Sequence, residues 1–468
     1  MDAGAGGRRL SGAAVPWRLH PAPFRSGGLS LPGDKSITHR AILLGALAEG
    51  ETRITGANSG EDSEASLSAA AALGATVMRE PGLLRLGGVA GRLREPLADL
   101  DCGNSGTSLR LLAGVVAGAP IHAVLTGDAS LRRRPVDRIV FPLRAMGARL
   151  SARDGDRFPP LVVDGGGLRG ADFDEPTASA QVASCILLAA LSAAGPTRVL
   201  TLAGVRDHTV HTLRTFGVRV SADLVTGKPM KIQLEGPQVA RATEVSIPGD
   251  PSAAAFFLAA AAATPGLSLE ARGINLNPTR IGFLEVLARM GAEVEIRPRG
   301  EAAGEPVGDV KVTGPAALSA TDVPRTLVPA MVDEVPAWAM AAALARGTSR
   351  MTGAGELRIK ESDRLRVLSE NLRVLGIEAH DSADGLTISG GTPRGGRILA
   401  HGDHRIAMAF AVLATRADGP VLVDDAASVA TSFPGFESAF RSLGGRLDRE
   451  VDTGDGMPGT SSRPGNPA

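Results

Sequence analysis

The hydrophobic and polar positions of this chain repeat in short units of one kind. In each unit an Ala/Leu-rich run with helical spacing leads to a turn with glycine and then to a β-branched stretch, as in "AALSAAGPTRVLTLAG" and "AALARGTSRMTG". A second helical run follows, then a glycine and a short β-like tail, which gives the order helix, turn, strand, helix, glycine cap, strand. The closing glycine occurs six times, at Gly74, Gly147, Gly217, Gly291, Gly376 and Gly444. The pattern predicts an α/β fold built from six repeats.

A longer period groups these repeats into two halves. "LPGDKS" at 31–36 matches "IPGDPS" at 247–252, a separation of 216 residues that equals about three short repeats. We therefore expect two lobes of three units each, 34–248 and 249–449, with a strand from 25–33 added to the second lobe. No G-x-G-x-x-G follows a predicted strand and no P-loop is present, which disfavours a dinucleotide-binding or nucleotide-hydrolysing fold.

The ends of the chain differ in composition from the repeats. The segment 450–468 is rich in Gly, Pro and Ser, and 1–24 contains arginines but no apolar signal core. We expect both to be flexible tails. A transit peptide is the alternative for the N-terminal segment, because it is rich in arginine and poor in acidic residues.

Charge and cysteine content narrow the possible partners. The formal net charge of the 468 residues is zero, so nothing global attracts nucleic acid or a membrane surface, and no apolar run reaches the roughly 20 residues of a membrane span. Cys102 and Cys185 have no metal-binding spacing and form no disulfide framework, which fits a reducing cytoplasm. Anion binding would have to come from local groups of cations.

One such cation stands out by its rarity. Lys35 is one of five lysines in a chain with 45 arginines. It follows Pro-Gly-Asp and precedes an apolar helical run, where backbone N–H groups and the helix dipole attract an anion. In the second half the matching position is Pro251, so the repeat itself does not need the lysine. Lys35 is therefore a candidate ligand for a phosphate or carboxylate.

Four further segments contain candidate chemistry, although each alone has a plainer interpretation. "DCGNSGTSLR" around Gly106 offers a backbone nest or simply a capped turn, and "GDASLRRRPVDR" around Arg134 could be a solvated charge run. "RIKESDRLR" sets Lys360 and Arg364 four residues apart on one helical face, which could also be an exposed helix with ion pairs. "HGDHRIAMAF" starts an apolar helix with a His, but no second metal ligand follows at helical spacing, so we expect no metal there.

In this order and spacing the segments resemble the EPSP synthase family. The resemblance runs from about residue 28 to 447 and includes "LPGDKSITHR", "GNSGTSLR", "RRRPVDR", "ASAQV", "VRDHT", "MVDEVP", "RIKESDRL", "DHRIAMAF" and "SFPGF". It implies a two-lobed enolpyruvyl transferase fold, an inside-out α/β barrel with three βαβαββ units per lobe. It also implies a cytoplasmic monomer of the shikimate pathway that moves the enolpyruvyl group of phosphoenolpyruvate to the 5-hydroxyl of shikimate 3-phosphate, without a cofactor or metal.

The resemblance also implies roles for single residues. Shikimate 3-phosphate would be held by Lys35, Ser36, Arg40, Ser179, Ala180, Gln181 and Arg206, and phosphoenolpyruvate by Lys35, Gly106, Arg134, Gln181, Arg364 and Arg405. Asp333 would be the base toward the 5-hydroxyl, and Glu361 the acid that protonates the methylene carbon and later takes a proton back. Lys360 would contact the hydroxyl and keep Asp333 ionised. A helix N-cap is the alternative for Asp333, and which carboxylate acts in which step stays open.

Two positions depart from the common family pattern. Thr431 stands where many members have a lysine, and Arg206 stands where others have a serine. Both features resemble a subgroup of the family that tolerates the inhibitor glyphosate. That subgroup often has alanine at the position of Gly106, and this chain does not. One alternative is the sister enzyme that transfers enolpyruvate to UDP-N-acetylglucosamine. That enzyme has a cysteine in a loop that corresponds to residues 121–140, where this chain has none, and a Lys-Asn pair where this chain has Lys35-Ser36. A non-catalytic anion-binding scaffold is the other.

Overall fold

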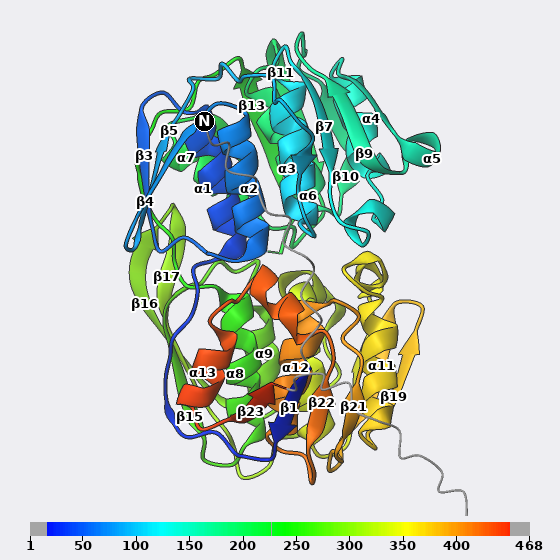
Figure 1. The fold of residues 1–468 in the computed structure, drawn as a ribbon. Coiled ribbons are helices and arrows are strands. Elements are labelled where there is room, and N and C mark those ends of the chain that lie inside the picture. Colours follow the sequence, from blue (N-terminus) through cyan, green and yellow to red (C-terminus); the bar gives the residue numbers. More distant parts are fainter. Residues whose placement is uncertain (1–15, 226, 450–468) are drawn as a thin grey trace, which may run out of the picture.

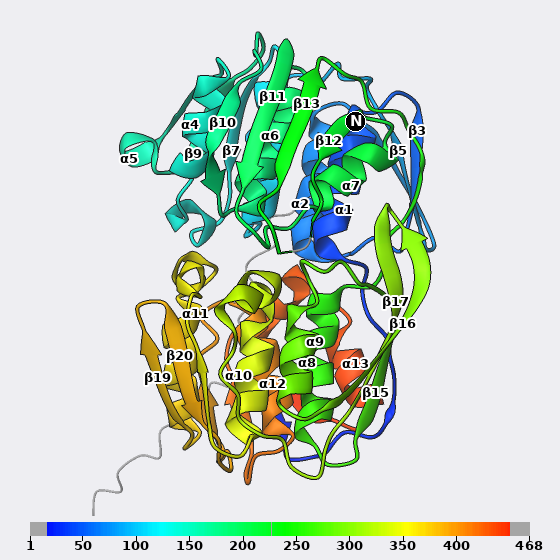
Figure 2. The same cartoon turned by 180° about the vertical axis from the view of Figure 1, so that it is seen from behind.

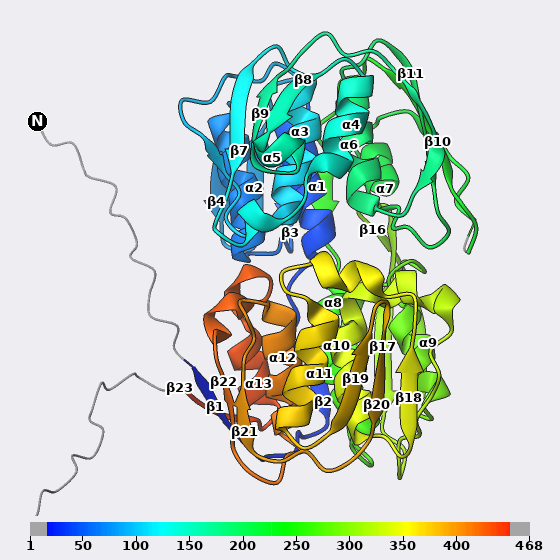
Figure 3. The ribbon, with the colours of Figure 1, turned by 90° about the vertical axis from the view of Figure 1, so that its right-hand side faces the viewer.

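The computed structural model describes residues 16–225 and 227–449, which form two lobes placed end to end (Figure 1). In each lobe the sheets lie on the outside and the helices fill the interior, as Figures 2 and 3 show from the back and the side. Six sheets are present in the described part of the chain, five of four strands and one of three. The expected two-lobed α/β fold is therefore confirmed.

The middle unit of the first lobe shows the plan of five of the six described sheets, and the three-stranded sheet lacks only the first strand of that plan. In the middle unit the first two strands are parallel, and the last two run as a hairpin whose final strand lies against the second, so the sheet order is first, second, fourth, third. Its elements are β6 (Leu100–Asp101), α3 (Gly106–Ala117), β7 (His122–Thr126), α4 (Asp137–Ala145), β8 (Arg149–Ala152) and β9 (Phe158–Asp164), with short helical turns η1 (Leu131–Arg133) and α5 (Arg153–Asp156). The βαβαββ unit expected from the resemblance is present.

The other two units of the first lobe follow the same order. One consists of β10 (Asp172–Thr177), α6 (Ala180–Ala190), β11 (Gly195–Thr201), α7 (His208–Thr215), β12 (Val220–Ala222) and β13 (Lys231–Gly236). In the other, the first strand comes from the end of the lobe: β14 (Glu244–Ser246) pairs in parallel with β3 (Glu51–Thr55), beside α1 (Lys35–Leu47), α2 (Glu61–Ala72), β4 (Thr76–Glu80) and β5 (Leu83–Gly87).

The second lobe repeats this plan with two borrowed strands. β2 (Gly27–Leu29) pairs with β15 (Ser268–Asn275), next to α8 (Pro251–Ala263), α9 (Gly282–Arg289), β16 (Glu293–Ala302) and β17 (Glu305–Thr313). The three-stranded sheet has η2 (Arg325–Glu334), α10 (Val335–Leu344), β18 (Thr348–Met351), η3 (Gly355–Ile359), α11 (Arg364–Val374), β19 (Glu378–Ser382) and β20 (Gly385–Ser389). The last unit has β21 (Gly396–Ile398), α12 (His404–Ala414), β22 (Val421–Val423), η4 (Ala426–Thr431), α13 (Phe436–Ser442) and β23 (Arg446–Arg449).

The missing fourth strand of that last sheet comes from the N-terminal segment. β1 (Trp17–His20) lies between β22 and β23, and the ring of Trp17 stacks on Phe436 with centroids 5.7 Å apart. The side chains of Trp17, Leu19 and Phe24 are buried. The expectation of a flexible tail over 1–24 was therefore wrong for residues 17–24, because 17–20 complete a sheet and Phe24 packs in the core of the second lobe. Residues 1–15 and 450–468 lie outside the described residues.

The six glycines that defined the repeats end six helices. Each lies two residues after its helix (α2, α4, α7, α9, α11 and α13) and has a φ between 72° and 109°. That left-handed conformation is the usual C′ position of a helix and is costly for residues with a Cβ. The sequence pattern of helix, glycine cap and strand is confirmed at these six positions.

The two copies of the Pro-Gly-Asp motif are the places where the chain passes between the lobes. They run side by side in opposite directions: Gly33 and Gly249 form a β-bridge, and Asp34 N–H donates to the carbonyl of Pro248. Asp34 caps α1 and Asp250 caps α8. Arg280 donates to both carboxylates, at 3.0 Å from Asp34 and 3.1 Å from Asp250, and is only 1% exposed. One buried guanidinium thus joins both crossovers.

Close backbone contact at the crossover gives a first prediction. A Cβ at Gly33 would lie 1.9 Å from the carbonyl oxygen of Gly56, whereas a Cβ at Gly27 has nothing within 4 Å. Gly33→Ala should therefore lower the free energy of unfolding by about 1–3 kcal/mol, the usual cost of overpacking. Urea unfolding of both variants measures this. Equal stabilities of Gly33→Ala and Gly27→Ala would contradict the packing described here.

The helices of each lobe form its hydrophobic core. In the second lobe every residue of α8, Pro251–Ala263, is buried, which explains its uniformly apolar sequence. One helical stretch of the described chain, Arg325–Leu344, is apolar and long enough to cross a membrane, and 67% of it is buried inside the protein. Burial in the core accounts for the composition of that stretch.

Candidate functional site

A cavity of about 410 Å³ lies between the lobes, and all fourteen residues proposed from the sequence line it. From the first lobe these are Lys35, Ser36, Arg40, Gly106, Arg134, Ser179, Ala180, Gln181 and Arg206; from the second they are Asp333, Lys360, Glu361, Arg364 and Arg405. The lining residues are up to 370 positions apart in sequence. The two-lobed fold brings them to one place.

Helix N-termini supply much of the cavity wall. Six helices present their first residues to it: α1 (Lys35, Ser36), α3 (Gly106, Thr107), α6 (Ala180, Gln181), α7 (His208), α11 (Arg364) and α12 (Arg405). Side chains just before five of them accept hydrogen bonds from the first turns: Asp34, Ser105, Ser179, Asp363 and Asp403. The free N–H groups and the positive dipole ends of these helices therefore favour bound anions.

Side-chain charges act in the same direction. Nine cationic side chains line the cavity, against four carboxylates: Lys35, Arg40, Arg110, Arg134, Arg138, Arg206, Lys360, Arg364 and Arg405 face Asp62, Asp333, Glu356 and Glu361. Burial lowers the pKa of Arg40 and of Arg110 to about 10, so both stay charged at neutral pH. A ligand pair with several negative charges would balance this excess.

Lys35 is held by a carboxylate that the sequence did not indicate. Its ammonium donates to Asp62 Oδ2 at 2.6 Å, and the two side chains are 14% and 9% exposed. Asp62 lies in the first turn of α2, inside the ordinary-looking stretch "GEDSEAS". The pair fixes the ammonium at the wall of the cavity.

Asp333 lies among cations from both lobes. Arg206 from the first lobe donates to its Oδ2 at 2.6 Å, and Arg364 donates to its Oδ1 at 3.3 Å, while Lys360 Nζ is 3.9 Å from Oδ1. Burial would raise the pKa of Asp333, but Arg206 and Lys360, with two more arginines, hold that pKa well below its usual range. Asp333 is part of η2, so the alternative of a helix N-cap was wrong.

Glu361 bridges the lobes in a similar way. It accepts a hydrogen bond from Arg364 and another at 3.5 Å from Arg134 of the first lobe. Burial would raise the pKa of Glu361, but Arg364 and Arg134 outweigh burial and hold it well below its usual range. Glu361 therefore carries a negative charge in this arrangement.

Arg364 is the second-lobe cation that connects these carboxylates. It is 1% exposed, and its Nε donates to Asp403 Oδ2 at 2.8 Å. The expected helical face with Lys360 is absent, because η3 ends at Ile359 and α11 begins only at Arg364. Lys360 lies in the turn between these helices and donates to Glu356 at 3.2 Å. Lys360 and Arg364 therefore both line the cavity, although they do not lie on one helix.

Three further predicted residues, Gln181, Arg40 and Arg405, are fixed by hydrogen bonds to other elements of the fold. Gln181 donates to Thr107 Oγ1 at 2.9 Å, and Arg40 donates to Thr209 and Ser184 at 2.7 and 2.8 Å. Arg405 donates to the carbonyl of Asp333 at 2.8 Å. Thr431 is buried, donates to the carbonyl of Ser428, and does not line the cavity. Thr431 was not among the residues predicted for the site, and its place outside the cavity lining agrees with that.

Some lining residues were missed in the sequence. Thr107 and Arg110 lie inside the quoted segment "GNSGTSLR", and Arg138 inside "RRRPVDR", so the motifs gave a signal for them. Asp62 lies inside "GEDSEAS" and Glu356 lies just before "RIKESDRLR", at positions where the sequence gave no comparable signal. Only the fold brings Asp62 next to Lys35 and Glu356 next to Lys360.

Comparison with known proteins gives one consistent family. The family model for EPSP synthase (3-phosphoshikimate 1-carboxyvinyltransferase) matches residues 24–440. A 3-phosphoshikimate 1-carboxyvinyltransferase from Halorhodospira halophila is 48% identical over 439 residues, 93% of this chain and 97% of that protein. One from an Anaeromyxobacter strain is 50% identical over 416 residues, 88% of this chain and 92% of that protein.

Solved structures agree with the fold. EPSP synthase from Acinetobacter baumannii superposes with a TM-score of 0.81 at 40% identity, covering 93% of this chain and all of that one. The enolpyruvyl transferase NikO from Streptomyces tendae superposes with a TM-score of 0.75 at 17% identity, covering 94% of this chain and 99% of that one. The second likeness concerns the fold alone.

Proposed function

The chain belongs to the EPSP synthase family and transfers the enolpyruvyl group of phosphoenolpyruvate to the 5-hydroxyl of shikimate 3-phosphate, and we propose that the fourteen residues predicted from the sequence carry out this reaction in the interlobe cavity. The observation that supports this most strongly is their convergence on one cavity wall from both lobes. The reaction releases inorganic phosphate.

Charge balance supports the assignment of both substrates to this cavity. Each phosphate brings about −1.5 to −2 charges at neutral pH, and each substrate adds a carboxylate. Shikimate 3-phosphate would lie on the first-lobe side, against Lys35, Ser36, Arg40, Ser179, Ala180, Gln181 and Arg206. Phosphoenolpyruvate would lie between Lys35, Gly106, Arg134, Gln181, Arg364 and Arg405. Four of these ligands lie in the first lobe, and Arg364 and Arg405 lie in the second, so both lobes would hold the donor.

Lys35 would contact both anions. Its ammonium is a compact charge with three rotatable donors, whereas the planar fork of arginine suits one bidentate partner. Asp62 keeps the ammonium at the cavity wall at 2.6 Å. A lysine at this position can therefore serve two ligands from one place, which is our explanation for a lysine in a chain so rich in arginine.

Proton transfer would rest on the two interlobe carboxylates. Asp333, ionised by Arg206 and Lys360, would accept the proton of the 5-hydroxyl. Glu361 would protonate the methylene carbon and later take a proton back. When phosphoenolpyruvate engages Arg134 and Arg364, Glu361 shares its two cationic partners with the ligand, so its pKa rises toward the range of a general acid.

The test of this function is phosphate release from phosphoenolpyruvate with two acceptors. Shikimate 3-phosphate should support turnover, and UDP-N-acetylglucosamine should not. Turnover with the nucleotide sugar alone would favour the sister reaction, and absence of turnover with both would favour a non-catalytic scaffold. We further propose a cytoplasmic monomer with lobes 34–248 and 249–449.

Glyphosate, an inhibitor expected to compete for the phosphoenolpyruvate pocket, gives a prediction about Gly106. A Cβ at Gly106 would lie 2.6 Å from Arg110 Nη1 and 3.4 Å from Arg134 Nη1, so it would project toward the cations of the donor site. Glyphosate is longer than phosphoenolpyruvate, so the added methyl should hinder it more. Gly106→Ala should raise the ratio of the glyphosate inhibition constant to the KM of phosphoenolpyruvate.

Steady-state inhibition assays measure that ratio. Gly28→Ala is the matched control, because a Cβ there meets nothing within 4 Å and the residue lies in a strand of the second lobe. A ratio for Gly106→Ala that is unchanged or lowered would show that this loop does not form a wall of the donor pocket.

A further inference from the structure

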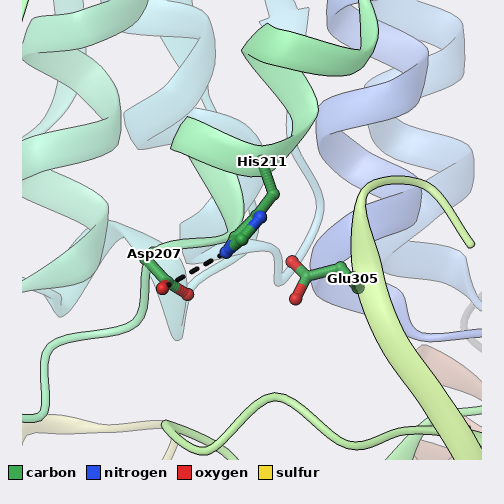
Figure 4. Close-up of side chains that lie close together, drawn as sticks. All are labelled: Asp207, His211 and Glu305. Carbon is green, nitrogen blue, oxygen red and sulfur yellow. Dashed lines mark hydrogen bonds and ion pairs between the residues drawn. The ribbon is translucent and has the colours of Figure 1, made fainter. Parts of the chain in front are cut away.

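A second group of ionisable side chains lies beside the crossover, outside the cavity lining. Asp207 precedes α7, His211 is in its first turns, and Glu305 begins β17 of the other lobe (Figure 4). One ligand atom from each, two carboxylate oxygens and an imidazole nitrogen, lie within 4.8 Å of one another. Among residues 16–225 and 227–449 no other group of three such side chains is gathered so closely. The group joins the two lobes.

Neighbouring side chains hold the two carboxylates in place. Asn277 donates from one amide nitrogen to Asp207 Oδ1 at 2.6 Å and to Glu305 Oε2 at 2.7 Å. The Oδ1 of Asn277 accepts from the backbone and hydroxyl of Thr279, which fixes the amide in this orientation. Metal-binding carboxylates in proteins are usually oriented by such hydrogen bonds.

His208 orients Glu305 from the other side. Arg280 donates to His208 Nε2 at 3.2 Å, and since a guanidinium only donates, that nitrogen must be the acceptor. The hydrogen therefore lies on Nδ1, which donates to Glu305 Oε1 at 2.7 Å. Glu305 is 0% exposed and cannot turn away to solvent. Its second oxygen, Oε2, faces the group with only the bond from Asn277.

The electrostatics of the group favour an added positive charge. Apart from His211, the donors to the two carboxylates of the group are Asn277 and His208, and both are neutral, since His208 Nε2 accepts from Arg280. Arg280, which donates to His208, has its carboxylate partners in Asp34 and Asp250. His211 is the one side chain of the group that is not a carboxylate, and its Nε2 lies 3.3 Å from Asp207 Oδ2. This nitrogen can donate a hydrogen bond to Asp207 or bind a metal ion.

We propose that Asp207, His211 and Glu305 bind a divalent first-row transition ion of the Zn²⁺ class. A mixed set of one imidazole and two carboxylates suits Zn²⁺, Co²⁺ or Mn²⁺, whereas Ca²⁺ and Mg²⁺ favour oxygen ligands alone. Three protein ligands would leave the remaining positions to water. The ion would take the place of the hydrogen bond between His211 Nε2 and Asp207 Oδ2, with both atoms directed to the metal.

The site would act on the contact between the two lobes and not on the reaction. The tip of the hairpin formed by β16 and β17 rests on α7, where a Cβ on Gly304 would lie 3.2 Å from the carbonyl oxygen of His211. Ala303 of the same tip is buried with the core of the first lobe. A bound ion would tie this second-lobe hairpin to the first-lobe helix and hold the lobes in register.

The test uses the full chain, freed of metal with a chelator and titrated with Zn²⁺ by calorimetry and with Co²⁺ by visible absorption. We expect one saturable equivalent, Co²⁺ bands of a protein site, and a higher unfolding midpoint with Zn²⁺. His211→Gln and Asp207→Asn should each weaken binding at least tenfold and abolish the rise in the midpoint. His122→Gln is the matched control, because His122 forms a similar pair with Asp164 at 2.7 Å on the surface.

Each other outcome would overturn the proposal. Absence of saturable binding would leave the group as a purely hydrogen-bonded clasp between the lobes. Binding that survives in His211→Gln, or that is lost in Glu361→Gln instead, would place the ion elsewhere. Because the readouts are binding and stability, they are independent of the proposed roles in the cavity.

Discussion

Glu361→Gln should lower kcat by a factor of about 10² to 10⁴, which is the usual contribution of general acid–base catalysis. The KM of each substrate should change only a few-fold. The amide keeps the size and shape of the side chain, and its one oxygen can still accept from Arg364 or from Arg134, which donate to different oxygens of Glu361 in the structure. It cannot deliver a proton to the methylene carbon or take one back. The loss should therefore fall on turnover.

Steady-state kinetics with phosphate release as the readout checks this result. Glu370→Gln is the matched control, because Glu370 is an α11 residue that pairs with Arg366 at 3.1 Å and does not line the cavity. It should keep full activity. Near-normal turnover of Glu361→Gln would remove Glu361 from the mechanism, and a large rise in KM with unchanged kcat would reassign it to binding.

Arg280→Met should destabilise the protein by about 3–5 kcal/mol, as is usual when one partner of a buried ion pair is removed. Arg280 is fully enclosed, and its guanidinium is shared by Asp34 and Asp250, which are 0% and 6% exposed. Methionine fills much of the volume but neutralises neither carboxylate. Burial alone would lower the pKa of Arg280, yet Asp34 and Asp250 hold it above its usual range, so the arginine is charged in the native protein.

Denaturant unfolding at pH 7 measures the change. Arg289→Met is the control, because Arg289 forms an exposed pair with Glu285 at 2.8 Å on α9, and pairs of that kind contribute less than about 1 kcal/mol. If both variants lost equally little stability, the crossover would not depend on its central guanidinium. A double variant that also changes Asp34 to Asn should lose less than the sum of the single changes.

The repeat architecture could be predicted from the sequence because it leaves local signals. A glycine with positive φ after a helix, such as Gly74 or Gly291, is required by backbone sterics at each repeat. The cavity residues were predicted for another reason: their segments begin helices, as with Gly106 and Arg405, and together they matched a family.

Features made by distant partners left no such signal. Trp17 looked like part of a tail because its sheet neighbours, β22 and β23, lie over 400 residues away. Asp62 could not be assigned to Lys35 from sequence, since the pairing depends on how α2 packs beside α1. In the same way His211 and Glu305 meet only because a hairpin of one lobe reaches a helix of the other.

The borrowed strands also bear on how the protein is made. The elements from α1 to β14 are continuous in sequence, so the first lobe can be completed as soon as the ribosome has released them. The second lobe cannot, because β1 must lie between β22 and β23, which are synthesised last. At about 5–20 residues per second, the opening segment waits on the order of 20–80 seconds for its partners. When β23 leaves the ribosome, the first lobe can already be folded, whereas this sheet of the second lobe stays open at its centre until β22 and β23 close around β1.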